Sequence, residues 1–304
     1  MMLLLEQSLN GLQFAAMLFM LASGLTLIFG IMGVINLTHG SFYMVGAYCA
    51  AVAVLSTGSF LVGVAAALVG AGLYAIAVEL AVVQWLYRRD HLYQVLATLG
   101  LILFTNEAVS MIFGRRPPLM DIPPFLRGSV GILPGLDYPV MRLAFIVVGV
   151  FVAVGLWLLV NHSRLGMLIR AGADDREMVD ALGVDIRRLY TWVFGLGGLL
   201  CGLAGVMAAP LFAVEIGMGE RVLITTFVVI VIGGVGSVRG ALLGALLVGM
   251  TDSLGRAYLP QALQLVLPPA TADTLGAGLV SASIYVLMTV VLLVRPLGLV
   301  SARS

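Results

Sequence analysis

One compact group of polar side chains, Asn36, Thr38 and His39, lies between two long apolar runs. An amide, a hydroxyl and an imidazole this close together could hydrogen-bond a polar solute or line a gate where a helix breaks. The same three side chains could instead form a short turn at a membrane interface, with a histidine that is simply hydrated. The sequence leaves both interpretations open.

Two glutamates lie inside apolar stretches, where a carboxylate is costly and is often kept for function. Glu79 can lie near a helix end and pair with Arg88 or Arg89. Glu107, which follows a Thr-Asn pair, lies deeper and is the better candidate for a pathway residue or a contact between helices. The three histidines are far apart and show no metal-ligand spacing, so no metal site is expected and an intramembrane enzyme has almost no support.

The composition is that of a membrane protein. Of the 304 residues, 61% are hydrophobic and 10% are charged, whereas a soluble domain needs roughly 25% charged residues. All 16 basic residues are arginine, which excludes a P-loop and a pyridoxal Schiff base, so any ATPase must be another chain and no cofactor is expected. The net charge of +1 and the lack of a basic amphipathic run argue against a nucleic-acid partner.

Hydrophobic runs of span length follow one another along the whole chain, which predicts one all-α domain, 1–304, built as a polytopic bundle of about 8–10 spans. The runs cover 7–38, 40–78 (divided at 56–59), 93–113, 143–160, 189–209, 222–235, 240–251 and 275–294. The short pair within 222–251 is expected to form broken or re-entrant helices.

The arginines indicate the orientation. The segment 162–188 carries five of them, so we expect it to be cytoplasmic. Counting spans then gives a cytoplasmic C-terminus with Arg295 and Arg303, a periplasmic N-terminus and a periplasmic loop at 115–142. The pair Arg115-Arg116 opposes this arrangement, but the overall bias favours it.

A weak internal repeat joins GVINLTHG at 33–40 to GGVGSVRG at 233–240. Both segments end in a polar residue and glycine and then enter an apolar run, as expected for broken helices related by duplication. Gly233, Gly234 and Gly236 could let the backbone approach a solute, or could permit close packing of helices.

The segment 170–189 predicts a short amphipathic helix between two spans. Asp174 or Asp175 can cap it, and Met178, Ala181 and Leu182 form an apolar stripe at i, i+3 and i+4. Such a helix can lie on lipid or dock into the groove of a partner, or the segment can be a plain loop. Its charge is not strongly basic, which weakens the lipid alternative.

This segment resembles the coupling loop of permeases in the branched-chain amino acid ABC importer family, of the LivH type. Glu177, Ala181 and Gly183 occupy the places of the Glu/Ala…Gly pattern, although Met178 and Val179 replace the two adjacent alanines of the general importer pattern. The resemblance continues, in order, through INLTHGSFYM at 35–44, LATLG at 96–100, SRLGM at 163–167 and IGGVGSVRG at 232–240.

The resemblance implies a permease subunit of the bacterial inner membrane that forms half of the pathway for branched-chain amino acids or related small polar solutes and itself breaks no covalent bond. Its partners would be membrane lipid, a second permease (LivM type) or a second copy, two cytoplasmic ATPases and a periplasmic solute-binding protein. The residues expected to couple to the ATPases are Glu177, Met178, Ala181, Leu182, Gly183 and Val184; those expected in the pathway are Asn36, Thr38, His39, Glu107, Gly233, Gly234 and Gly236.

The main alternative is a stand-alone secondary transporter or solute channel. Such a protein would need no docking helix, but it would be expected to carry its own coupling-ion carboxylates near mid-membrane. Glu107 is the only good candidate for that role.

Overall fold

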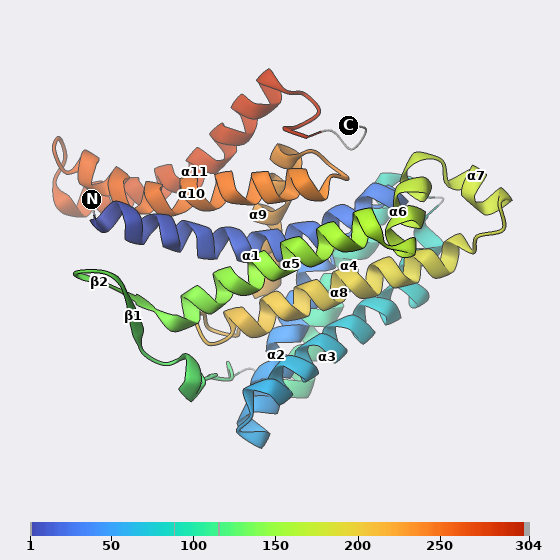
Figure 1. Cartoon of the computed structure of the whole chain (residues 1–304), viewed down its shortest axis with the longest axis horizontal. Coiled ribbons are helices and arrows are strands. Elements are labelled where there is room, and N and C mark those ends of the chain that lie inside the picture. Colours follow the sequence, from blue (N-terminus) through green and yellow to red (C-terminus); the bar gives the residue numbers. More distant parts are fainter. Residues whose placement is uncertain (1, 88, 115, 301–304) are drawn as a thin grey trace.

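Long helices make up most of the computed structural model, which describes residues 2–87, 89–114 and 116–300 (Figure 1). The span-length helices are α1 (Met2–Met32), α2 (His39–Thr57), α3 (Phe60–Ala81), α4 (His91–Phe113), α5 (Val140–His162), α8 (Ile186–Ala208), α10 (Val238–Leu263) and α11 (Pro269–Val294). The shorter elements are α6 (Arg164–Asp174), α7 (Arg176–Ala181), α9 (Met218–Gly233), the 3-10 turns η1 (Val83–Leu86) and η2 (Pro124–Leu126), and the hairpin β1 (Ser129–Leu133) and β2 (Leu136–Pro139).

The eight span-length helices confirm a polytopic helical membrane protein. Of the two segments expected to be short, α9 has 16 residues, but α10 has 26 and continues well past residue 251. That expectation was wrong for α10 because its two charges do not end the helix. Asp252 and Arg256 lie one turn apart and form an ion pair, with Nε–Oδ2 and Nη2–Oδ1 distances of 2.8 and 2.9 Å.

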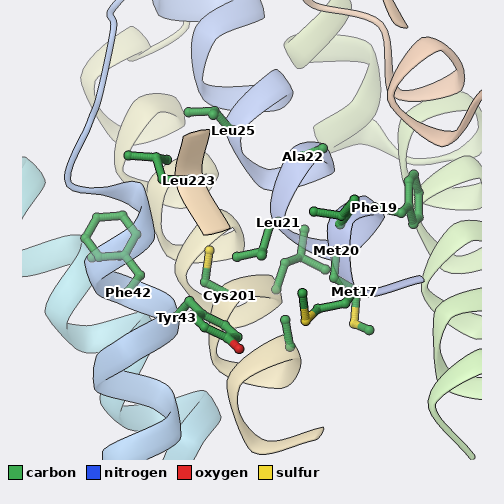
Figure 2. Packing of buried hydrophobic residues seen from close by; sticks show 14 of the residues in the cluster. Met17, Phe19, Met20, Leu21, Ala22, Leu25, Phe42, Tyr43, Cys201 and Leu223 are labelled. Carbon is green, nitrogen blue, oxygen red and sulfur yellow. The ribbon is translucent and has the colours of Figure 1, made fainter. Parts of the chain in front are cut away.

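Helix α1 forms the centre of the bundle and packs against α10 and α8 over much of its length. Close approach depends on small residues: a Cβ atom on Gly249 of α10 would lie 2.6 Å from the carbonyl oxygen of Gly11. Figure 2 shows the core at the middle of α1, where Leu21 and Leu25 meet Phe42 of α2, Cys201 of α8 and Leu223 of α9.

The chain turns back into the bundle after α1. The helix ends at Met32, Gly33 adopts a φ of +63°, and residues 33–38 lead to α2. The first residue of α2, His39, has its Nε2 atom 3.1 Å from the carbonyl oxygen of Leu21. Leu21 lies eleven residues before the end of α1, about 16 Å along the helix axis, so α2 begins deep inside the protein.

Helix α9 also begins inside the bundle. A Cβ atom on Gly219 would lie 2.1 Å from the carbonyl oxygen of Gly40, which places the first turn of α9 against the first turn of α2. The two segments of the expected repeat therefore each contain a helix break, with the positive-φ glycines Gly33 and Gly234 directly after α1 and α9. The duplication itself stays a prediction.

The two ends of the bundle differ in what they carry. The start of α1 contacts the hairpin, where Tyr138 Oη donates to Asn10 Oδ1 at 3.1 Å. The other end of α1 faces α6, since a Cβ atom on Gly172 would be 3.6 Å from Ile31. The N-terminus and the α6–α7 segment thus lie at opposite ends, as the span count requires. Which end is cytoplasmic stays a prediction, and Arg88, Arg115 and Arg303 lie outside the described residues.

Candidate functional site

The polar group at the start of α2 is completely buried. Asn36, Thr38 and His39 have no exposed surface, which excludes the hydrated interfacial turn considered above. The backbone N–H of Thr38 donates to Asn36 Oδ1 at 3.0 Å, and Thr38 Oγ1 donates to the carbonyl oxygen of Thr98 on α4 at 3.2 Å. We call residues 33–39 the elbow, because the chain reverses there between α1 and α2.

His39 joins three helices at the elbow. Its Nε2 atom lies 3.1 Å from the carbonyl oxygen of Leu21 on α1 and 3.1 Å from Sγ of Cys201 on α8. The Cys201 thiol is also 3.6 Å from the carbonyl oxygen of His39, to which it can donate. This contact could not be predicted from the sequence, because a cysteine in an apolar run is most simply a small buried hydrophobe.

Two polar atoms of the elbow have no hydrogen-bond partner among the described residues, His39 Nδ1 and Asn36 Nδ2. Buried polar side chains are nearly always hydrogen-bonded, so each such atom calls for an explanation. Both atoms belong to residues singled out from the sequence, and both lie where α2 begins. They are available to a polar group that enters this part of the bundle.

Gln94, at the start of α4, supports the elbow from outside. Its Oε1 accepts a hydrogen bond from the backbone N–H of Ile35 at 3.3 Å, while its Nε2 donates to the carbonyl oxygens of Leu86 and Arg89 at 3.2 and 3.1 Å. Sequence reasoning missed this buried amide. The available signal was the i, i+4 spacing of Gln94 and Thr98 at the beginning of an otherwise apolar run.

Glu107 is not brought to the elbow. It lies on α4 but is exposed on the surface of the chain. Its neighbour Asn106 instead turns toward α9 and donates to Glu220 Oε1 at 2.5 Å.

Glu79 is buried near the end of α3 and accepts two hydrogen bonds, from Tyr87 Oη at 2.6 Å and from Thr191 Oγ1 of α8 at 2.9 Å. Burial, and next the hydrogen bond to this carboxylate, raise the pKa of Tyr87, so the phenol stays a donor. Of the two arginines expected to pair with Glu79, Arg88 lies outside the described residues and Arg89 forms no ion pair with it.

The three candidate glycines lie at the far end of α9. A Cβ atom on Gly233 would be 2.2 Å from the carbonyl oxygen of Gly240, and Gly234, with a φ of +103°, packs against residues 297–300. A Cβ atom on Gly30 would be 3.0 Å from Cα of Gly236. Fourteen residues, or about 21 Å, separate Gly233 from the contact of Gly219 with the elbow side of α2. In this conformation the glycines serve close packing.

The predicted amphipathic helix is α7. Of the two candidate caps, Asp175 is the one used: its Oδ1 accepts the backbone N–H groups of Glu177 and Met178, both at 3.0 Å. Gly183, with a φ of +86°, follows the helix. Val179 is buried and anchors the helix, whereas the side chains of Met178 and Leu182 are 58% and 76% exposed. Glu177 and Ala181 are exposed as well, and Val184 is half-buried.

Helix α8 connects α7 to the elbow. Only four residues, 182–185, separate α7 from α8, and Asp185 caps α8 by accepting the N–H of Arg188 at 3.1 Å. From Asp185 to Cys201, the thiol beside His39, an unbroken helix covers about 24 Å. Helix α8 thus links the exposed α7 segment at one end of the bundle to the buried polar elbow.

Comparison with known proteins adds an independent observation. Residues 7–295 match the family model described as branched-chain amino acid transport system / permease component. The high-affinity branched-chain amino acid transport system permease protein BraD of Pseudomonas aeruginosa is 28% identical, over 97% of this chain and 95% of its own. LivH of Escherichia coli K12 is 28% identical, over 84% and 87%, and a probable LivH of Methanocaldococcus jannaschii is 25% identical, over 82% and 80%. No solved structure matches the chain.

Proposed function

The chain belongs to the family of branched-chain amino acid transport system permease components, and on that premise we propose that it forms half of the translocation pathway of an ABC importer. The solutes would be branched-chain amino acids or related small polar molecules. The observation that carries the proposal is the connection just described, in which an exposed apolar helix is joined by α8 to a buried polar elbow.

Helix α7 is the proposed docking element for a cytoplasmic ATPase. Val179 holds α7 against the chain, while Met178 on the helix and Leu182 directly after it are exposed. Together they form an apolar ridge that could enter a groove on the ATPase. Glu177, Ala181, Gly183 and Val184 complete the proposed contact. Because the chain has no lysine and hence no P-loop, ATP hydrolysis would take place on two partner chains.

The elbow is the proposed gate of the pathway. Asn36, Thr38 and His39 lie where α2 begins inside the bundle, and two of their polar atoms have no partner among the residues described. Movement of α8 would separate Cys201 from His39 and change the polar groups that face the pathway. Gly233, Gly234 and Gly236 would let the end of α9 adjust against α10 during this movement.

Glu107 is proposed to face the pathway or the second permease. It is exposed on the surface of a single chain within a span-length helix, and a carboxylate in that position is costly when it faces lipid. The second permease would be a LivM-type chain or another copy of this one.

The proposed setting is the bacterial inner membrane. The N-terminus and the 115–142 loop would be periplasmic, where a solute-binding protein would deliver the solute. The α6–α7 segment and the C-terminus would be cytoplasmic. The arginines at 164, 170, 176, 187 and 188, all in the segment at the α7 end of the bundle, support this orientation.

Purification of the tagged chain in mild detergent from its native membrane tests the proposal, followed by reconstitution into liposomes with and without internal ATP. We expect two P-loop ATPases and a second permease to co-purify, and uptake to require both ATP and the binding protein. Purification of the chain alone, with solute movement that needs no ATP, would establish a secondary transporter or channel instead.

A further inference from the structure

An ion pair lies on α10, outside the elbow and α7. Asp252 is the fifteenth and Arg256 the nineteenth of the 26 residues of α10. Both nitrogen–oxygen contacts of the pair are shorter than 3 Å. The Asp252 side chain is 12% exposed and the Arg256 side chain 60% exposed, so the guanidinium lies at the surface of the single chain.

This surface lies toward the end of the bundle that carries the start of α1, because Ser253 Oγ donates to the carbonyl oxygen of Gln7 at 2.7 Å. Arg256 lies about 8 Å along the axis from the midpoint of α10, and Gln7, which Ser253 contacts, is the sixth residue of α1. A long arginine can reach the membrane interface by extending toward its helix end. Arg256 does the opposite, because its guanidinium turns back one turn to Asp252. Arg256 therefore stays beside Asp252, at a cavity that both residues line.

A small cavity of about 160 Å³ opens beside the pair. Asp252 and Arg256 line it together with Thr225 of α9 and with Ser281 and Tyr285 of α11. Thr225 is the eighth of 16 residues in α9 and Ser281 the thirteenth of 26 in α11, so three helices contribute polar groups from their middles. We call this cavity the α10 pocket.

The hydrogen-bonding capacity of the α10 pocket is only partly used. Arginine has five N–H donors, and Asp252 takes only the Nε–H and one N–H of Nη2. The remaining donors present a fork that suits a second carboxylate. The carboxylate of Asp252 has lone pairs that Arg256 does not use. The Ser281 hydroxyl donates its hydrogen to the carbonyl oxygen of Ala277 at 3.2 Å, so the lone pairs of its oxygen also remain. Those lone pairs can accept from an ammonium group.

We propose that the α10 pocket is a subsite for the ammonium and carboxylate groups of a zwitterionic α-amino acid on its way through the importer. The carboxylate binds the free edge of Arg256, and the ammonium group binds Asp252 and Ser281. This inference rests on the proposed function and adds a site, and a chemical class of ligand, that the elbow and α7 do not supply.

The size of the pocket limits what it recognises. Its volume of about 160 Å³ equals that of roughly five water molecules in the liquid, which suits the head group of an amino acid and little more. The side chain of the solute would extend through the open side of the pocket, toward the second permease. The pocket would therefore bind the ammonium and carboxylate groups that all α-amino acids have. Selection between solute side chains would take place at another site.

Thiol labelling of a Ser281→Cys variant in the complete, reconstituted importer tests binding directly. L-leucine, and more weakly glycine, should slow labelling by a membrane-impermeant methanethiosulfonate. The analogues 4-methylpentanoate, which lacks the amine, and 3-methylbutylamine, which lacks the carboxylate, should not. Adding Arg256→Gln should weaken protection about tenfold or more, since it removes charge-assisted hydrogen bonds. The parent chain with Cys49 and Cys201 gives the background labelling.

ATP-driven uptake by the unaltered importer is measured in the same preparation, so the two proposals can fail separately. Absence of uptake would refute the proposed function. Uptake without protection in any nucleotide state, or equal protection by leucine and both analogues, would overturn the subsite alone.

A purely structural role for the ion pair predicts something different. It predicts that Asp252→Asn combined with Arg256→Gln, which leaves no unpaired charge, transports leucine at the normal rate, and that result would also overturn the subsite. We expect this double variant to assemble normally yet lose most uptake. The matched control is Thr289→Val on α11, which lies outside the pocket and bonds only to its own helix.

Discussion

The imidazole of His39 and the thiol of Cys201 lie 3.1 Å apart at the centre of the bundle, although 162 positions separate them in the sequence. His39 is the first residue of α2, and Cys201 lies two-thirds of the way along α8. The contact therefore joins the elbow to the helix that follows α7 after a four-residue connection. Under the proposed function, a movement of α7 would reach the buried polar elbow at this contact.

Replacing Cys201 by leucine should uncouple transport from ATP hydrolysis. The residue is fully buried, so the larger side chain must push α8 away from the elbow, at a cost of about 1–3 kcal/mol. We expect ATP hydrolysis by the assembled importer to continue while the amount of solute imported per ATP falls. Cys201→Ala, which adds no volume, is the control. An unchanged ratio in Cys201→Leu would show that this contact does not carry the coupling.

Two adjacent aspartates offer a matched test of α7. Asp175→Ala removes the cap that accepts two N–H groups, which costs about 0.5–2 kcal/mol, and should loosen residues 176–181 and reduce uptake. Asp174→Ala should leave both unchanged, because Asp174 is exposed and forms no such cap. Hydrogen exchange of 176–181 and ATP-driven uptake measure the two effects. Equal behaviour of the two variants would contradict the assignment.

The exposed ridge of α7 should tolerate no charge if it enters an ATPase groove. Met178→Glu or Leu182→Glu is expected to weaken ATPase binding at least about tenfold, as loss of a central contact does, and to abolish ATP-driven uptake. Ala173→Glu, an exposed position in α6, controls for the added charge. Co-purification of the ATPases and uptake are the measurements. Uptake that survives both ridge substitutions would favour a stand-alone transporter.

Alanine substitutions should distinguish glycines that allow close helix packing from glycines that have open space around them. Gly233→Ala should lower the midpoint of thermal unfolding, because its Cβ atom would meet the carbonyl oxygen of Gly240 at 2.2 Å, at a cost of about 1–3 kcal/mol or more. Gly278→Ala on α11 should be tolerated, since nothing lies within 4 Å of the added atom. A Gly233→Ala variant as stable as the parent would show that the ends of α9 and α10 part easily.

The sequence was sufficient to predict the helical class, most of the spans, the α7 helix with its cap, and a polar break before α2. Each of these depends on residues close together in the chain. Burial of the elbow could not be predicted, since the segment around Asn36 reads the same at an interface or folded back beside Leu21. The partners of His39 and Ile35, which are Cys201 and Gln94, are fixed only by tertiary packing.

Charges inside a helix also misled the sequence analysis. Asp252 and Arg256 made the seventh long run seem to stop at residue 251, although their i, i+4 spacing allows them to pair within one helix. Glu107 was favoured as the deeper carboxylate, yet the buried one is Glu79, which two hydroxyl groups satisfy. The position of a residue within a hydrophobic run does not determine which face of the helix its side chain occupies.

The last described residues of the chain complete the end of α9. The backbone N–H groups of Leu299 and Val300 donate to the carbonyl oxygens of Ile232 and Gly233 at 2.9 and 3.0 Å. These donors are synthesised 67 positions after the acceptors they satisfy, a delay of several seconds at roughly 5–20 residues per second. During biogenesis the last turn of α9 therefore lacks these two donors until residues 299 and 300 have been synthesised, and a chain truncated before them should open more easily at this end of α9.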